Sequence, residues 1–335
     1  MEIKAFAAHA TKADLKPFQY EPKPLGPFDV ELKISHCGIC HSDIHLIDND
    51  WRISSYPLVP GHEIVGTVTS AGTMVEHLKV GQRVGVGWQR SACMICDMCM
   101  SGQHNLCPKQ QATCAGNFGG FADRIRVDSR FAIPIPNALS SETAAPLLCG
   151  GITVFSPFMN FGVSPLHRVG VIGIGGLGHL ALQFARAFGC EVTAFSHTRE
   201  KASEARDFGA HHFVWTKDAE KLKAVAGTLD FIINTANADM DWTPFIEALR
   251  PNGKLCFVGV PPSPVSVPVN YLLGGRKSIA ASPIGSPEEI RKMLDFAARH
   301  HIGAKTEMRP MEEVNEALKK VRDNTVRYRM VLANT

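Results

Sequence analysis

The sequence lacks the features that mark several large classes of protein. No apolar run approaches the ~18 residues that a membrane-spanning helix needs; the longest, VGVIGIGGLG, is interrupted by glycine and ends at His179. The net charge is only +3, without the basic stripe that is typical of nucleic-acid-binding surfaces. No internal repeat or low-complexity tract is present. We therefore expect an enzyme-like globular chain with no nucleic-acid partner and no membrane association.

The first residues, MEIKAFAAHATKADLK, contain no uninterrupted apolar core of the signal-peptide type, because Lys4, His9 and Lys12 break it. This favours a cytoplasmic location, where disulfides are rare. The chain has only ten cysteines, yet four of them fall within fifteen positions. In a reducing compartment such a cluster indicates bound metal rather than a disulfide knot.

The clustered cysteines have the spacing Cys-x2-Cys-x2-Cys-x7-Cys, which suits a closed tetrahedral zinc site with no open position for substrate. A zinc ribbon that reads nucleic acid is the main alternative, but the flanks carry few basic residues. An iron–sulfur cluster is a second alternative, because thiolates bind both metals. The four candidate ligands are Cys93, Cys96, Cys99 and Cys107.

The pattern of the chain changes near residue 150, and its 335 residues suit about two domains. Before that point, short alternating apolar runs such as DVELKIS and DRIRV predict an antiparallel or barrel-like β domain. After it, strand and helix patterns alternate, which predicts a parallel sheet wrapped by helices. Further on, Ser286 followed by Pro287 and Glu289 predicts the capped start of a helix.

The segment GIGGLG lies between the predicted strand RVGVIGI and an amphipathic helix, the context that the dinucleotide-binding fingerprint requires. Gly173, Gly175 and Gly178 let the backbone approach a pyrophosphate, and the helix N-terminus presents free N–H groups to it. The alternative is a tight strand-to-helix turn without a ligand. We expect a nucleotide-binding loop that also includes Gly176 and Leu177.

The end of the following strand indicates which cofactor is bound. NAD-binding folds usually place Asp or Glu there to accept a hydrogen bond from the ribose 2′-OH, but this chain has Ser196. Hydroxyls and cations suit a 2′-phosphate instead, so we predict NADP(H). The alternative is that the cations are only the solvated start of a helix. The candidate residues are Ser196, His197, Thr198, Arg199 and Lys201.

Three dispersed segments, CGICHSDIH, GHE and LLCGG, contain cysteine and histidine, the donors that zinc prefers. Spacing along the chain does not show that these segments meet, and a lone buried cysteine such as Cys149 is more often a packing residue than a ligand.

These motifs, in this order together with the four-cysteine lobe, resemble the zinc-dependent medium-chain alcohol dehydrogenases over essentially the whole chain. GICHSD, RVGVGW, VRYRMVL and the serine at the strand end resemble the cinnamyl alcohol dehydrogenase branch and its bacterial relatives, the NADPH-dependent aldehyde reductases. The resemblance implies an α/β fold with a GroES-like β-rich catalytic domain (1–152 and 286–335) and a Rossmann domain (153–285) with a doubly wound parallel sheet. It also implies a homodimer.

The resemblance further implies roles for individual residues. It places a catalytic zinc on Cys40, His62 and Cys149 with Glu63 beside it, and a structural zinc on the four clustered cysteines, giving two zinc ions per chain. Ser42 matches the hydroxyl that exchanges a proton with substrate, His45 the relay histidine, and Asp43 an acid near the zinc site. Thr153 matches a cofactor contact, whereas His197 departs from the branch's usual run of serines.

The expected function is aldehyde reduction or alcohol oxidation with NADP(H) and broad aromatic or aliphatic specificity, since apolar pockets reject poorly. The rivals are an NAD-dependent polyol or threonine-type dehydrogenase, and a non-catalytic zinc-stapled nucleotide-binding protein. The alternative for some candidate pocket residues is ordinary core packing. The residues predicted to line the substrate pocket are Trp51, Trp88, Phe118 and Ile284.

Overall fold

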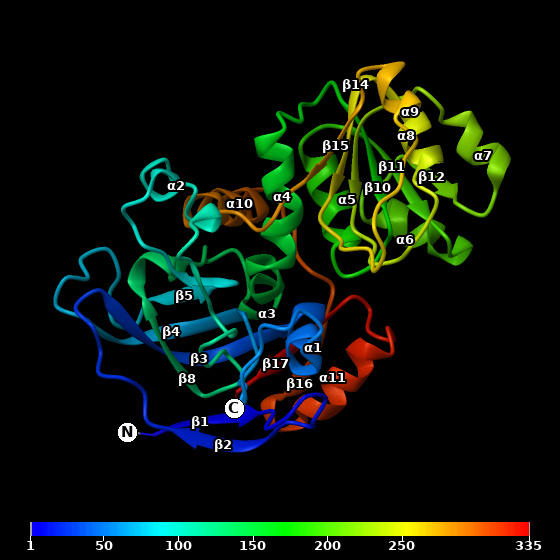
Figure 1. Cartoon of the computed structure of the whole chain (residues 1–335). Helices are drawn as coiled ribbons and strands as arrows, with labels where there is room; N and C mark the ends of the chain where they lie inside the picture. Colours follow the sequence, from blue (N-terminus) through cyan, green and yellow to red (C-terminus); the bar gives the residue numbers. More distant parts are fainter. Residues whose placement is uncertain (1, 335) are drawn as a thin grey trace. The chain divides into compact units, whose positions relative to one another are not determined.

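The computed structural model describes residues 2–334 and divides into two compact units. One unit contains the chain up to Ile152 and from Ile284 onward, and the other spans Thr153–Pro283 (Figure 1). Both ends of the sequence therefore contribute to one unit, and the second unit is inserted between them. Among the described residues, no helix is both long enough and apolar enough to cross a membrane.

The first unit is built on a seven-stranded sheet in the order β16-β17-β3-β4-β5-β9, with β8 also paired to β3. The pairs are antiparallel except β16 with β17. Two smaller sheets accompany it. The main strands are β3 (Asp29–Ile39), β4 (Glu63–Ala71), β5 (Arg83–Val86), β8 (Arg124–Asp128), β9 (Ile133–Pro134), β16 (Thr306–Pro310) and β17 (Arg329–Ala333); the small sheets pair β1 (Ile3–Ala7) with β2 (Lys16–Tyr20) and β6 (Gln89–Ser91) with β7 (Gln111–Ala112).

Strand β3 is the centre of this unit because it pairs with β4, β8 and β17. The alternation seen in its sequence is reproduced in part in its burial: Val30, Leu32 and Ile34 are buried and Lys33 is exposed, but Glu31 is buried as well, where it pairs with Arg124 and Arg126. The three buried apolar side chains join a large apolar core. The end of β3 leads directly into helix α1 (His41–Asp48), which positions the residues from Cys40 onward.

The predicted helix start at Ser286 is confirmed as a capping box. The Glu289 amide donates to the Ser286 hydroxyl oxygen at 3.3 Å, and the Ser286 amide donates to the Glu289 carboxylate at 2.7 Å. The helices of the first unit are α1, α2 (Asp97–Met100), α3 (Ser141–Ala144), α10 (Pro287–Arg299) and α11 (Val314–Arg322), with 3-10 turns η1 (His104–Leu106), η2 (Ser129–Phe131), η3 (Ala145–Leu148) and η5 (Met311–Glu313).

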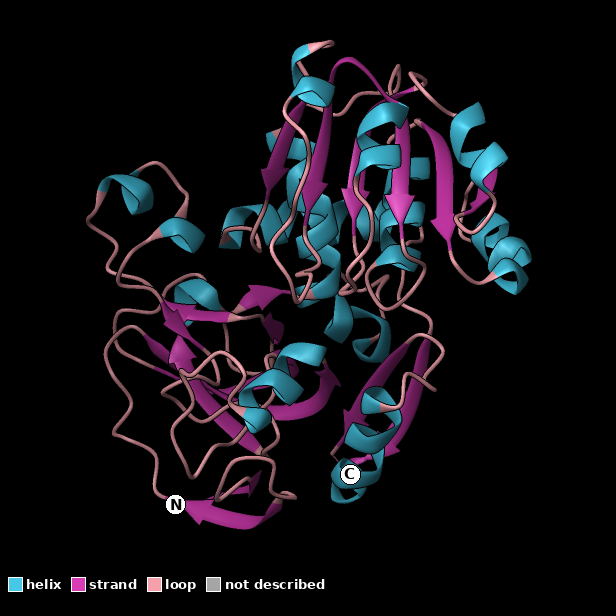
Figure 2. Cartoon of the chain, turned by 45° about the vertical axis from the view of Figure 1, so that its right-hand side comes forward, coloured by secondary structure: helices cyan, strands magenta, loops and turns pink. Residues whose placement is uncertain are grey.

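The second unit contains the predicted parallel sheet, with six strands in the order β12-β11-β10-β13-β14-β15. Helices lie on both sides of it (Figure 2). Its strands are β10 (Arg168–Ile172), β11 (Glu191–Ser196), β12 (His212–Trp215), β13 (Leu229–Asn234), β14 (Leu249–Phe257) and β15 (Ser278–Ala281). Its helices are α5 (Gly178–Ala187), α6 (Ala202–Asp207), α7 (Ala219–Ala224), α8 (Thr243–Ala248) and α9 (Asn270–Leu273), with the 3-10 turn η4 (Arg199–Lys201), and α4 (Gly150–Asn160) begins at the boundary.

The central strands of this sheet read as continuous apolar runs because both faces are covered. Helix α5 buries Leu180, Ala181 and Phe184. It is terminated just before Gly189, whose φ of +87° favours glycine. Strand β12 and helix α7 were not predicted from the sequence. β12 is an edge strand that is mostly half-buried or exposed, and α7 buries no residue, so neither shows a clear apolar pattern.

Candidate active site and metal centres

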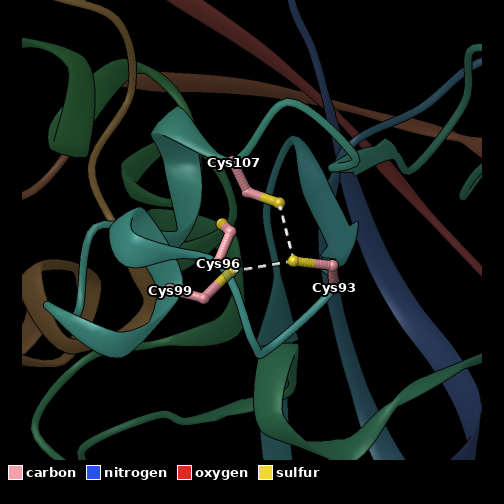
Figure 3. A group of neighbouring side chains, drawn as sticks. All are labelled: Cys93, Cys96, Cys99 and Cys107. Carbon is pink, nitrogen blue, oxygen red and sulfur yellow. Dashed lines mark hydrogen bonds between the residues drawn. The ribbon is translucent and has the colours of Figure 1, made fainter.

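The four clustered cysteines converge on one point in the first unit (Figure 3). The Sγ atom of Cys93 lies 3.9 Å from that of Cys99 and 3.5 Å from that of Cys107. Four sulfurs placed ~2.3 Å from one zinc ion stand about 3.8 Å apart, whereas a disulfide needs S–S near ~2.05 Å. All ten cysteines are free thiols. The arrangement therefore fits a closed tetrahedral metal site.

Backbone amides around this cluster favour thiolates. The N–H groups of Ile95 and Cys96 point at Cys93 and lower its pKa to about 6, and the Lys109 amide donates to the Cys107 sulfur at 3.4 Å. The exposed residues here include Ile95 and Met100, which are 81% and 76% exposed and apolar. A zinc ribbon that binds nucleic acid would present cations instead. The lobe therefore fits a structural metal site better than a nucleic-acid-binding one.

A second group of donors, Cys40, His62, Glu63 and Cys149, also converges, with one ligand atom from each within 4.8 Å of the others. Cys40 precedes α1, Glu63 begins β4, and Cys149 lies between η3 and α4. The Sγ atoms of Cys40 and Cys149 are 4.0 Å apart although the residues are 109 positions apart in sequence. The fold thus brings three segments together, a contact that their spacing along the sequence could not show.

The imidazole of His62 is fully buried and oriented as a metal ligand. Its Nδ1 lies 3.0 Å from Oδ1 of Asp43, while its Nε2 has no hydrogen-bond partner among the described residues. The same carboxylate accepts from the amides of Gly61 and Cys40, each at 2.9 Å. Asp43 therefore fixes the histidine tautomer and the cysteine backbone together, as expected of an acid behind a zinc ligand.

The carboxylate of Glu63 is buried and pairs with the guanidinium of Arg329, which the sequence analysis missed. Burial raises the pKa of Glu63 to about 7, although Arg329 acts to lower it. A Cβ atom on Gly38 would stand 2.1 Å from Glu63 Oε2, so glycine is needed there to seat the carboxylate. The only signal in the sequence was an arginine inside the otherwise apolar strand RMVL.

Two polar residues of the predicted proton path lie on α1. The Ser42 hydroxyl is 3.6 Å from the Cys40 sulfur. His45 Nδ1 lies 2.7 Å from the Asp50 carboxylate, and these side chains are 33% and 49% exposed. Asp50 was not identified from the sequence. Since it bonds Nδ1, it leaves Nε2 of His45 as the nitrogen that can exchange a proton elsewhere.

The four predicted pocket residues do not form one group. The Trp88 ring lies 5.0 Å from the His62 ring, and Trp51 lies 6.0 Å from Trp88 and 5.2 Å from His45, centroid to centroid. Phe118 instead contacts Tyr20 at 4.4 Å and Phe18 at 5.4 Å. The backbone carbonyl of Ile284 accepts from Asn105 at 2.7 Å. The recorded ring contacts of the described residues therefore connect Trp88 directly with His62, and Trp51 with His62 through Trp88.

In the second unit, the glycine loop joins β10 to α5 as the fingerprint requires. Gly173 has a φ of +86°, and a Cβ on Gly178 would stand only 1.9 Å from the Gly173 carbonyl oxygen. At Gly175 an added Cβ would meet nothing within 4 Å, so the backbone there faces open space. Gly176 and Leu177 complete the turn, with Leu177 at the N-cap of α5. This loop fits a pyrophosphate.

The predicted 2′-phosphate residues follow β11 directly. Ser196 ends the strand, is 4% exposed, and accepts from the Thr198 amide at 3.1 Å. The Lys201 ammonium donates to the Ile174 carbonyl in the glycine loop. His197 and Arg199 are exposed, and Thr153 is 9% exposed on α4. β11 ends in Ser196 rather than in a carboxylate, and the next acid, the exposed Glu200, follows in η4. A serine at the strand end fits a phosphorylated ribose better than a free 2′-OH.

Comparisons with known proteins agree with this geometry. Two family models match the chain: the alcohol dehydrogenase GroES-like domain over residues 26–137 and the zinc-binding dehydrogenase over residues 176–299. The aldehyde reductase AdhA of Synechocystis sp. is 46% identical over 333 residues, covering 99% of both chains. The 8-hydroxygeraniol dehydrogenase of Catharanthus roseus is 43% identical, covering 99% of this chain and 96% of that one.

Solved structures extend the likeness to the fold. A cinnamyl alcohol dehydrogenase from Sorghum bicolor matches with a TM-score of 0.95 and 39% identity, covering 99% of this chain and 98% of that one. The CAD from Helicobacter pylori, complexed with NADP(H), matches with a TM-score of 0.92 and 33% identity over the same shares. The predicted GroES-like and Rossmann domains are thereby confirmed. The chain belongs to the zinc-dependent medium-chain alcohol dehydrogenases, in the branch of the cinnamyl alcohol dehydrogenases and aldehyde reductases.

Proposed function

We propose that the protein is an NADPH-dependent aldehyde reductase of broad specificity that also catalyses the reverse alcohol oxidation. The observation that carries the proposal is the buried donor set Cys40, His62 and Cys149, in which His62 Nε2 has no partner among the described residues. A buried, unpaired ring nitrogen is costly unless a ligand satisfies it. Three protein donors leave a fourth position open, as a catalytic zinc site requires.

The residues of this site would hold zinc in a defined way. Cys40, His62 and Cys149 supply the donors, Asp43 orients His62, and Arg329 neutralises Glu63 beside them. When bound, zinc supplies Lewis acidity to a carbonyl oxygen. The structural counterpart is the four-cysteine lobe, so the chain has donors for two zinc ions.

Ser42 and His45 are the residues proposed to transfer the proton. The Ser42 hydroxyl stands beside the Cys40 sulfur, where it can donate a hydrogen bond to substrate oxygen or accept one from it. Serine alone is a poor acid, so its proton must be restored by another proton-carrying group. The imidazole of His45 can carry a proton on Nε2, because Asp50 holds Nδ1 and leaves the ring partly open to solvent.

Residues of the second unit support NADP(H) as the cofactor. The loop Gly173–Gly178 and the N-terminus of α5 suit a pyrophosphate, and the nicotinamide supplies or accepts hydride when bound. Ser196, Thr198 and the nearby cations suit a 2′-phosphate. A relative of known structure from the same branch is complexed with NADP(H), which supports the assignment. Thr153 and Lys201 complete the proposed cofactor residues.

A panel of substrates tests this proposal. We expect aromatic and aliphatic aldehydes to be reduced with NADPH, at a kcat/KM at least about tenfold above that with NADH, because charge-assisted hydrogen bonds are worth ~1.5–3 kcal/mol each. The variation between aldehydes should be modest, since the neighbouring Trp51 and Trp88 discriminate by apolar contact alone. The measurement is nicotinamide absorbance in zinc-replete buffer. Faster oxidation of a polyol or threonine with NAD⁺ would favour the rival dehydrogenase.

We also propose a homodimer, formed through the edge of the parallel sheet. Strand β15 is the last strand of that sheet, so its outer backbone groups have no strand partner among the described residues. Apolar side chains are exposed beside it, with Leu273 75%, Val269 64% and Ile279 39% exposed. A second copy related by a two-fold axis would cover the same patch on both chains.

Light scattering on a gel-filtration column tests the dimer. The double variant Ile279→Lys/Leu273→Lys should be monomeric, because two buried like charges would face their copies across the axis. Leu166→Lys is the matched control, since Leu166 is 91% exposed in the same unit but lies far from β15 in sequence, and this variant should remain dimeric. A wild-type monomer, or a double variant that stays dimeric, would contradict the proposed interface.

A further inference from the structure

An aromatic residue, Trp215, holds the end of β11, where Ser196 stands in place of the usual carboxylate. Trp215 is the last residue of β12 and stands opposite Ser196, the last residue of β11. Its indole N–H donates to the His197 carbonyl at 3.1 Å. The next amide, of Thr216, donates to the Ser196 carbonyl at 2.9 Å. The last residue of β12 and the residue that follows it therefore fix two consecutive carbonyls, those of His197 and Ser196.

The same ring also holds a cation. The guanidinium carbon of Arg199 lies 5.8 Å from the Trp215 ring centroid, within the range of a cation–π contact. No ion pair to Arg199 is recorded among the described residues, although the exposed Glu200 follows it in η4. Arg199 is exposed and long, and without the ring its side chain would sample many rotamers. The indole thus restricts an unpaired positive charge to the neighbourhood of Ser196.

These contacts have a consequence for specificity. A 2′-phosphate differs from a 2′-OH by negative charge and acceptor oxygens, so groups that are preorganised for an anion favour NADP(H) without changing NAD(H) binding. The turn carries hydroxyls at Ser196 and Thr198, and Arg199 is the cation placed over the ring. The carbonyl that Trp215 satisfies would otherwise point a partial negative charge into the same turn.

We propose that Trp215 is the positioning residue that makes this strand end selective for a 2′-phosphate, by fixing the His197 carbonyl and holding Arg199 over its ring. The inference rests on the proposed use of NADP(H) and adds the residue that sets the preference. The Trp215 side chain is not expected to bond the nucleotide, since its one N–H donates to the His197 carbonyl.

Calorimetric titration of the full-length protein with NADP⁺, NAD⁺ and 2′,5′-ADP tests this role without turnover. Trp215→Leu should lower the affinity for NADP⁺ and 2′,5′-ADP by about tenfold, the combined scale of one cation–π contact and one hydrogen bond. The affinity for NAD⁺ should fall by less than about twofold. Trp215→Phe keeps a ring but no N–H, and should fall between the wild type and Trp215→Leu. In assays with saturating aldehyde and varied NADPH, the KM for NADPH should rise while kcat stays within about twofold.

A double-mutant cycle separates positioning from general damage. Arg199→Gln should lower the affinity for NADP⁺ clearly in the wild type but much less in the Trp215→Leu background, because the Arg199 guanidinium no longer has the indole ring to hold it there. Lys217→Gln is the matched control: it removes an exposed charge two residues from Trp215 and should leave the ratio of NADP⁺ to NAD⁺ affinity unchanged.

The outcomes separate this inference from the cofactor proposal. Wild-type protein that binds NAD⁺ as tightly as NADP⁺ would overturn both. The role of Trp215 alone would be overturned if the wild type prefers NADP⁺ and both Trp215→Leu and Trp215→Phe retain that full preference. It would also be overturned if both variants lose affinity for NADP⁺ and NAD⁺ equally.

Discussion

Replacing His62 with alanine is expected to remove one of two zinc ions per chain and to lower aldehyde reduction by at least about 10³-fold, while NADP⁺ affinity stays within about twofold. The imidazole is fully buried, and its Nε2 is left without a partner among the described residues, so it is the nitrogen available to metal. The lost Lewis acid is worth several kcal/mol, and ~4 kcal/mol corresponds to that factor.

The nucleotide should still bind because the glycine loop and the strand-end residues belong to the second compact unit, whereas His62 belongs to the first. Zinc is counted by metal analysis, NADP⁺ affinity by calorimetry, and activity by nicotinamide absorbance. His77→Ala is the matched control: the one side-chain hydrogen bond recorded for His77 among the described residues is to the Ser129 carbonyl in the same unit, so this variant should keep two zinc ions and full activity. An active His62→Ala protein with both ions would show that the donor set is not the catalytic centre.

The elements that sequence could predict are those fixed by local patterns. The capping box at Ser286 depends on residues three apart, the glycine loop on a strand and helix that flank it, and the four-cysteine lobe on a short stretch of chain. Each is set by nearby residues, so each can be read without knowing the topology.

The site features that needed the fold are contacts between distant segments. Arg329 reaches Glu63 across 266 positions because β17 pairs with β3, which pairs with β4. The residues around Arg329 in VRYRM give no indication that its partner is Glu63. Asp50 was missed for a different reason: an exposed acid near a helix end usually has no special role, and only its 2.7 Å contact with His45 distinguishes it. The contacts of Phe118 with Phe18 and Tyr20 also needed the fold, because aromatic core and pocket positions look alike in sequence.

Replacing Arg329 with methionine is expected to destabilise the first unit by about 3 kcal/mol, because it leaves the Glu63 carboxylate buried without its counter-ion. Arg329 is 6% exposed and Glu63 is fully buried, and no other ion pair to that carboxylate is recorded among the described residues. The Gly38 backbone packs against the carboxylate, so the side chain has little room to turn toward water. Urea unfolding followed by hydrogen exchange in peptides covering β3, β4 and β17 measures the loss in this unit.

The double variant Arg329→Met/Glu63→Gln separates the buried charge from the lost packing. It removes both charges at nearly constant volume, and replacing both members of a buried pair is often close to neutral, so most of the lost stability should return. Arg309→Met is the control, because Arg309 pairs with Glu313 at the surface with both side chains 39% exposed, and such pairs contribute only ~0.5 kcal/mol. If the double variant were as unstable as Arg329→Met, the guanidinium would be acting through packing, and Glu63 would not depend on it as a counter-ion beside the zinc ligands.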